Sequence, residues 1–134
     1  MKLVDAYTRP IAAVVLYGLL QERTPETSIS HRAMPTFEQH EEYVRARPHP
    51  YWYLIEQSGA YVGAIYLSHD DEIGVFVFER CRRHGHARAA IELLIKTHPR
   101  TRYLANINPR NEASMRLFGT LGFTHLQNTF ERRS

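Results

Sequence analysis

One short stretch of this 134-residue chain, Arg82-Arg83-His84-Gly85-His86-Ala87, carries residue types and a spacing suited to binding an anion. It follows a strand-like apolar run, residues 72–78, and precedes a helix-like run, residues 89–95. The first N–H groups of a helix have no partner within it, and the helix dipole favours negative charge there. Gly85 allows a ligand to approach the backbone closely. The stretch therefore predicts a phosphate-binding turn.

Composition limits what kind of protein this is. With 43% hydrophobic residues the chain can form a core, and its length predicts one domain, residues 1–134. A net charge of +3 favours an acidic ligand but is too small to indicate a nucleic-acid partner. The single cysteine, Cys81, fits a reducing compartment, so we expect a cytoplasmic protein. The apolar run at residues 11–20 is too short to span a membrane.

Metal binding is not expected. His84 and His86 are two residues apart in a loop, and the sequence offers no third ligand near them.

Periodicity and turn residues predict alternating strands and helices. The expected elements are a strand at 2–7, helices at 8–21 and 36–47, strands at 51–57, 61–68 and 72–78, a helix at 86–98, a strand at 102–107, a helix at 111–121 and a strand at 123–130. Hairpin-linked strands followed by strand–helix–strand units predict an α/β fold. Its twisted sheet is mixed but mostly antiparallel, with helices on both faces.

A second motif follows the expected fifth strand: Asn111-x-x-Ser114, then Phe118, then Leu121-Gly122-Phe123. Together with Arg82-x-x-Gly85-x-Ala87, and in this order of elements, it resembles the GNAT superfamily of N-acetyltransferases. The resemblance covers nearly the whole chain. It implies a sheet splayed between its fourth and fifth strands and acetyl-coenzyme A (acetyl-CoA) as co-substrate.

The resemblance also implies which residues hold acetyl-CoA. The amides of the loop after the fourth strand would bind the pyrophosphate, that strand would pair with the pantetheine arm, and the second motif would contact the arm from the other side. The implied residues are Val75, Phe76, Val77, Arg82, Arg83, His84, Gly85, His86, Ala87, Arg88, Asn106, Asn111, Ser114 and Phe118, with Arg110 as a further phosphate contact.

The implied reaction is direct acetyl transfer from the thioester to an amine, which must first lose a proton. Glu72 or Asp71 is the expected base, and a backbone N–H near Val77 is the expected donor to the oxyanion. Many family members carry a tyrosine at the position of Phe118, whose hydroxyl protonates the thiolate. Here water, Tyr66 or Tyr103 would have to replace it.

The acceptor is an amine of a small molecule or a protein. Ser30 and His31, between the first two helices, and Tyr66 are the candidate acceptor contacts. Only about a dozen residues follow Leu121, so the acceptor side is expected to be open or completed by a second copy in a homodimer. Two alternatives remain: a non-catalytic acyl-CoA sensor, which Phe118 favours, and a small basic nucleic-acid-binding module.

Overall fold

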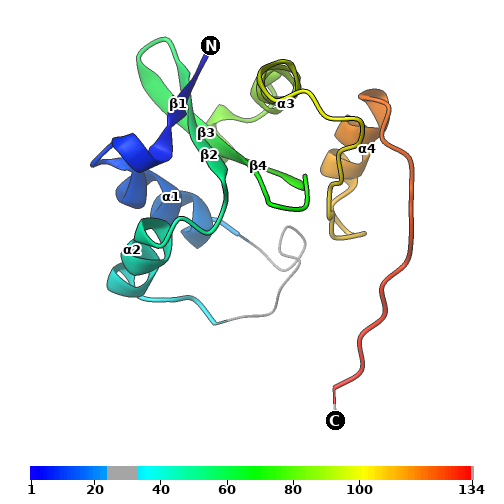
Figure 1. Ribbon diagram of the computed structural model, residues 1–134, viewed down its shortest axis with the longest axis horizontal. Helices are drawn as coiled ribbons and strands as arrows, with labels where there is room; N and C mark the ends of the chain where they lie inside the picture. Colours follow the sequence, from blue (N-terminus) through cyan, green and yellow to red (C-terminus); the bar gives the residue numbers. More distant parts are fainter. Residues whose placement is uncertain (24–32, 134) are drawn as a thin grey trace.

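The structure, a computed structural model, describes residues 1–23 and 33–133 (Figure 1). Its elements are β1 (Lys2–Asp5), the 3-10 helix η1 (Ala6–Thr8), α1 (Ala12–Gln21), α2 (Phe37–Arg45), β2 (Tyr51–Gln57), β3 (Ala60–Leu67), β4 (Ile73–Val77), the 3-10 helix η2 (Glu79–Cys81), α3 (His86–Thr97) and α4 (Glu112–Thr120). Among the described residues, no helix is both long and apolar enough to cross a bilayer.

The four strands form one antiparallel sheet in the order β1-β2-β3-β4. The β2–β3 hairpin turns at Ser58 and Gly59, both with positive φ (52° and 80°), which suits the right-handed twist of the flanking strands. In the β3–β4 pair, Ala64 lies opposite Phe76 and Tyr66 lies opposite Gly74. The expected α/β fold, with helices on both faces of the sheet, is confirmed.

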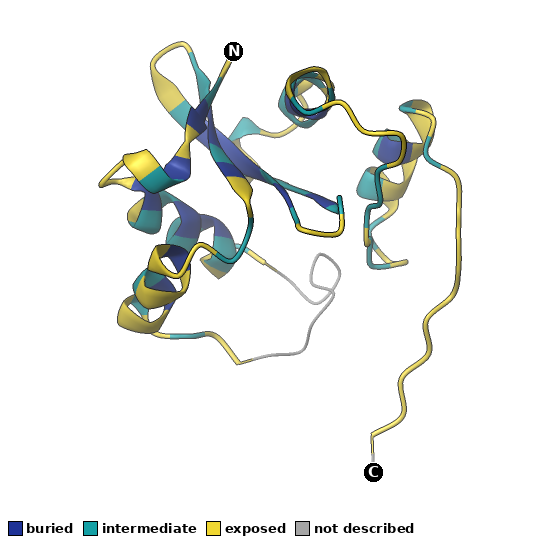
Figure 2. Ribbon diagram, viewed as in Figure 1, coloured by how far each residue is buried: buried dark blue, intermediate teal, exposed yellow. Residues whose placement is uncertain are grey.

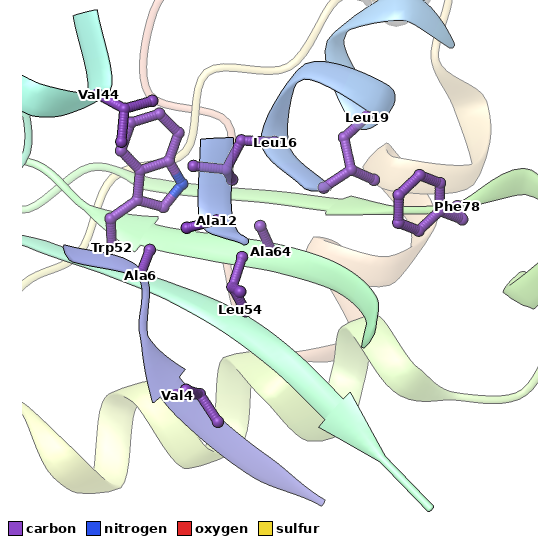
Figure 3. Close-up of a cluster of buried hydrophobic side chains, with 10 residues drawn as sticks. All are labelled: Val4, Ala6, Ala12, Leu16, Leu19, Val44, Trp52, Leu54, Ala64 and Phe78. Carbon is purple, nitrogen blue, oxygen red and sulfur yellow. The ribbon is translucent and has the colours of Figure 1, made fainter. Parts of the chain in front are cut away.

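Alternating side chains of the strands build a core on each face. On one face, Trp52 and Leu54 of β2 pack with α1 and α2 (Figure 3). The buried members of this core are Val4, Ala6, Ala12, Leu16, Leu19, Val44, Trp52, Leu54, Ala64 and Phe78. We call this side of the sheet the α1/α2 face.

The opposite face packs against α3 and α4. Its buried members are Ile55, Val62, Ile65, Leu67, Ile73, Ala90, Ile91, Leu94 and Phe118. Buried positions follow the strands and the inward sides of the helices, whereas the chain after α4 is almost wholly exposed (Figure 2). At the edge of the sheet, β4 packs against α3, while α1 packs against the neighbouring strand β3.

The helix starts are specified by local chemistry. Thr36 caps α2: its hydroxyl accepts from Gln39 N at 3.2 Å, and the Gln39 side chain accepts from Thr36 N at 2.9 Å. The first helix begins later than expected, at Ala12 rather than residue 8. The Asp5 carboxylate accepts from Tyr7 N at 3.0 Å and stabilises η1 in place of a longer strand or helix.

Two expected strands do not form. At residues 102–107 only Leu104 pairs, in a parallel bridge with Glu72. Residues 123–130 contain no strand, and they run away from α4 as an exposed segment (Figure 1). A strand needs a neighbouring edge to pair with, and the segment after Leu104 provides no extended edge for the last residues.

Candidate functional site

The open edge of β4 forms one side of the site. Ile73 N donates to Leu104 O at 2.8 Å, and Leu104 N donates to Asp71 O at 3.0 Å. Past this bridge the segment from Ala105 onward is not in a strand. Because backbone groups alternate along a strand, and those of Gly74 and Phe76 face β3, the N–H groups of Val75 and Val77 face the open edge. Two backbone donors of β4 therefore point toward the space beside it.

That space is a pocket of about 110 Å³ between β4 and the segment leading into α4. Its lining residues are Arg23, Tyr66, Glu72, Ile73, Gly74, Val75, Phe76, Asn106, Ile107, Asn108, Asn111, Ser114 and Phe118. The structure thus brings together eight residues that sequence reasoning had singled out: Tyr66, Glu72, Val75, Phe76, Asn106, Asn111, Ser114 and Phe118. Phe76 contributes its side chain rather than a free backbone edge, since its backbone faces β3.

The two candidate bases lie in different surroundings. Glu72 is half-buried, lines the pocket, and donates its backbone N–H to the Ser68 hydroxyl at 3.0 Å. Asp71 forms an ion pair with Arg100, with Nε–Oδ1 at 3.0 Å, and is not among the lining residues. Of the two carboxylates, only Glu72 can meet a ligand in the pocket.

Tyr66 reaches the pocket by lying across Gly74. An added Cβ at position 74 would collide with the ring and hydroxyl of Tyr66. His49 stacks on the Tyr66 ring, with centroids 3.8 Å apart and planes parallel, and Trp52 meets it edge-on at 6.3 Å. Burial raises the pKa of Tyr66 and nearby Glu72 raises it further, while Arg23 opposes both effects. Tyr66 is therefore a neutral phenol, fixed in position and able to donate a hydrogen bond.

On the α4 side of the pocket, position 118 is a phenylalanine and therefore supplies no hydroxyl. The Asn111 side chain accepts from Ser114 N at 3.2 Å and so caps α4. Phe118, 4% exposed, packs edge-on against Phe123. Tyr103 does not replace the missing hydroxyl, because its own donates to His98 O at 2.6 Å and accepts from Arg100 N at 2.8 Å.

The predicted anion-binding turn has the expected geometry. Gly85 is the N-cap of α3 with φ +76°, no side chain caps the helix, and an added Cβ would meet nothing within 4 Å. The N–H groups of the first helical turn, from His86 on, have no intrahelical partner. Arg82, Arg83 and His84 are exposed around this turn.

The turn is tied to both β4 and α4. Arg82 Nε donates to Val77 O at 3.3 Å, at the end of β4. Arg88 Nη1 donates to the Thr120 hydroxyl at 3.0 Å and its Nε lies 3.2 Å from Glu92. Arg88 is therefore occupied by protein partners, whereas Arg82 and Arg83 surround the exposed N-terminus of α3.

Ser30 and His31 lie outside the described residues. In the described part of the chain, no three His, Cys, Asp or Glu side chains cluster as metal ligands would.

Sequence reasoning missed five of the lining residues: Arg23, Ile73, Gly74, Ile107 and Asn108. Gly74 carried a signal, since a glycine inside a β-branched strand often marks a close approach. Arg23 carried none, because a cation at the end of a helix is ordinary.

A sequence profile described as the acetyltransferase (GNAT) family matches residues 16–123. The chain belongs to this family. A search of curated proteins finds no match. Family membership indicates a transferase of acetyl groups. The geometry above, an open strand edge and a glycine-capped helix N-terminus, suits a ligand with an amide-rich arm and a pyrophosphate.

Solved structures of low identity share the fold. A domain from Methanocaldococcus jannaschii is 18% identical, with a TM-score of 0.75, over 97% of this chain and 93% of its own. A ribosomal-protein-alanine N-acetyltransferase from Brucella melitensis is 19% identical, with a TM-score of 0.74, over 95% and 86%. A candidate acetyltransferase from Salmonella typhimurium, yncA, solved with its cofactor acetyl-CoA, is 19% identical, with a TM-score of 0.67, over 92% and 78%.

Proposed function

We propose that this protein is an N-acetyltransferase that moves the acetyl group of acetyl-CoA directly to an amine. The observation that carries the proposal is the pocket beside β4, where the strand edge is open and Glu72, Tyr66 and Phe118 line one cavity. We place the pyrophosphate of acetyl-CoA at the N-terminus of α3, because Gly85 caps this helix without a side chain in the way. The pantetheine arm would lie along Val75 and Val77, with Asn106 and Asn111 opposite. We treat residues 1–134 as one catalytic domain.

In the proposed reaction, the amine arrives as an ammonium ion and transfers a proton to Glu72, directly or through water. Its lone pair then attacks the thioester carbonyl carbon. The carbonyl oxygen takes the negative charge and accepts a hydrogen bond from a β4 backbone N–H at the open edge. The attack forms the C–N bond, and collapse of the tetrahedral intermediate breaks the C–S bond. The thiolate receives a proton, for which Tyr66 is our proposed donor, and Tyr66 regains a proton from the nitrogen of the new amide. Glu72 releases its proton to solvent, and the products are the acetylated amine and free coenzyme A.

Tyr66 is favoured as the donor because its phenol stays neutral and lines the same pocket as Phe118. Phe118 itself has no proton to give. The role is chemically modest, since an alkyl thiol has a pKa of about 8.5 and its thiolate leaves readily.

The experiment that tests this function has two readouts. Acetyl-CoA should raise the melting temperature, and a panel of amines should release free thiol in proportion to acetylated product. Cys81, the one cysteine, contributes a constant background of one thiol per chain. Thermal stabilisation without turnover of any amine would instead support the acyl-CoA sensor that the missing hydroxyl at position 118 favours. No stabilisation by acetyl-CoA would contradict both functions.

We further propose a cytoplasmic location, supported by the single free cysteine. A second copy of the chain is our proposed cover for the acceptor side, supported by the exposure of Leu126 (67%) and Phe130 (90%) after α4. Light scattering of the purified protein, compared with a variant truncated after residue 124, tests the homodimer.

A further inference from the structure

Arg23 is a cation on the wall of the pocket that sequence reasoning did not anticipate. It follows the end of α1, and its guanidinium carbon lies 4.1 Å from the centroid of the Phe76 ring. Neighbouring groups partly desolvate Arg23 and lower its pKa although its side chain remains exposed, and the nearby phenols of Tyr66 and Tyr43 oppose that shift. The Phe76 ring and the end of α1 together hold the guanidinium beside the open part of β4.

Within the described residues, no carboxylate compensates the charge of Arg23. The ion pairs seen there join Arg45 to Glu41, Arg88 to Glu92, Arg100 to Asp71 and Arg133 to Glu131. The adjacent Glu22 is used elsewhere, because its carboxylate accepts from Glu79 N at 2.9 Å. The Arg23 side chain is exposed where it lines the pocket, so its guanidinium is accessible to a ligand from solution. A guanidinium pairs well with carboxylate oxygens, and an anionic ligand can supply that partner here.

The pocket also presents a negative charge. Glu72 and Arg23 both line it, and no ion pair joins them. The phenol of Tyr66 lines the same pocket, and the charges of Arg23 and Glu72 shift its pKa in opposite directions. One cavity thus offers a carboxylate, a guanidinium and a phenol. A ligand that fits this arrangement carries an ammonium at one end and an anion at the other.

We propose that the acceptor is a small amino carboxylate, such as a free amino acid. Its carboxylate binds Arg23 and its amine lies at Glu72. This inference rests on the proposed N-acetyltransferase function and names the substrate class of the same site. Guanidinium geometry matches the two oxygens of a carboxylate. The amino terminus of a long peptide fits less well, because its carboxylate lies far from the reacting amine.

The test uses matched acceptors that differ only in charge. Each amino acid of a panel is compared with its amide, which keeps the amine and loses the anion. We expect kcat/KM to be at least about tenfold higher for the acid, which corresponds to about 1.4 kcal/mol. Arg23→Gln should raise KM for the acids about tenfold with little change in kcat, and should leave the amides unaffected, since the contact contributes equally to ground and transition states.

A matched control is available in the same chain. Arg80 also lies over a phenylalanine, with its guanidinium carbon 4.4 Å from the Phe78 centroid, but it does not line the pocket. Arg80→Gln should keep the preference for acids over amides, and Arg23→Lys should restore part of it.

Each result decides a different question. Equal turnover of acids and amides, or an equal loss of both in Arg23→Gln, would overturn the amino carboxylate proposal while leaving N-acetyl transfer intact. A preference for phosphorylated amines or for peptide amino termini would overturn it as well. If acetyl-CoA binds and no amine is acetylated, the proposed function itself fails and this inference fails with it.

Discussion

The ring of Tyr66 lies across the backbone of Gly74, its cross-strand partner, and occupies the space that a side chain at position 74 would need. The two residues come from adjacent strands, β3 and β4, and both line the pocket. The absence of a side chain on one strand thus allows the phenol of the other to reach the edge of the sheet beside Glu72.

Gly74→Ala should therefore damage the site and the fold together. The added methyl group collides with a ring held by His49, so we expect a loss of about 1–3 kcal/mol in the free energy of unfolding and a fall in kcat/KM. Chemical denaturation and steady-state kinetics measure the two effects. Gly119→Ala is the control: it adds a methyl group in open space on α4 and should stabilise the protein by about 0.5–1 kcal/mol. Unchanged activity in Gly74→Ala would show that the position of Tyr66 is unimportant.

Removing only the hydroxyl of Tyr66 separates chemistry from packing. Tyr66→Phe keeps the stack with His49 and removes the proposed proton donor. Because the thiolate leaves readily, kcat should fall by no more than about 10²-fold, with unchanged affinity for acetyl-CoA. Tyr103→Phe provides the comparison, because its hydroxyl bonds to His98 O and Arg100 N. That variant should lose stability and keep its kcat. A fall in kcat for Tyr103→Phe with unchanged kcat for Tyr66→Phe would assign protonation of the thiolate to Tyr103.

Much of this site could be predicted from local sequence. Gly85 before an apolar helix and Asn111 before another both mark helix starts, and the structure has Gly85 and Asn111 as N-caps. Such features depend on backbone conformation within a few residues. The apolar alternation of β2, β3 and β4 similarly predicted the sheet that carries the pocket.

Features that depend on distant partners were not predictable in the same way. Leu104 has strand-forming neighbours, yet only one bridge, to Glu72, forms. Further pairing would require this segment to continue alongside the edge of β4, and the local sequence does not determine that path. Residues 123–130 have a strand-like composition and no edge to join. Arg23 enters the pocket only because α1 packs on the face that carries Phe76. Tertiary packing determines these positions, and the local sequence pattern does not predict that packing.

The carboxylate assignment can be tested with a pair of adjacent variants. Glu72→Gln removes the proposed base, and we expect kcat to fall by about 10²–10⁴-fold with acetyl-CoA affinity unchanged. Asp71→Asn removes the partner of Arg100 and should leave kcat near wild type, because Asp71 does not line the pocket. Steady-state kinetics and calorimetry measure both. A larger loss in Asp71→Asn than in Glu72→Gln would exchange their roles.

Gly85 offers a test of the anion-binding turn that is independent of the amine. Gly85→Glu places a negative charge at the proposed pyrophosphate position, so acetyl-CoA should bind about 100-fold more weakly or worse, a change of about 2.8 kcal/mol. Gly85→Ala shares the strain of a positive φ, which costs about 1–2 kcal/mol of stability, and adds no charge. Its affinity should remain much closer to wild type by calorimetry. Equal affinities for both variants would place the pyrophosphate elsewhere.

The histidine stacked on Tyr66 links stability to pH. Burial, with a smaller contribution from His69, lowers the pKa of His49 to about 4, whereas an unfolded chain titrates near 6.5. Above pH 6.5 neither state binds the proton. As pH falls from 6.5 toward 4, His49 is protonated in the unfolded state before it is protonated in the folded state. The free energy of unfolding therefore decreases by up to about 3 kcal/mol because of this group.

Buried His40, whose pKa is also lowered by burial, contributes in the same direction. His49→Phe keeps a ring over Tyr66 and cannot titrate, so it should reduce the difference in unfolding free energy between pH 7 and pH 4.5 without abolishing it. Urea denaturation at the two pH values measures that difference. An undiminished difference in the variant would mean that other groups account for the acid sensitivity and that His49 is protonated within the folded stack.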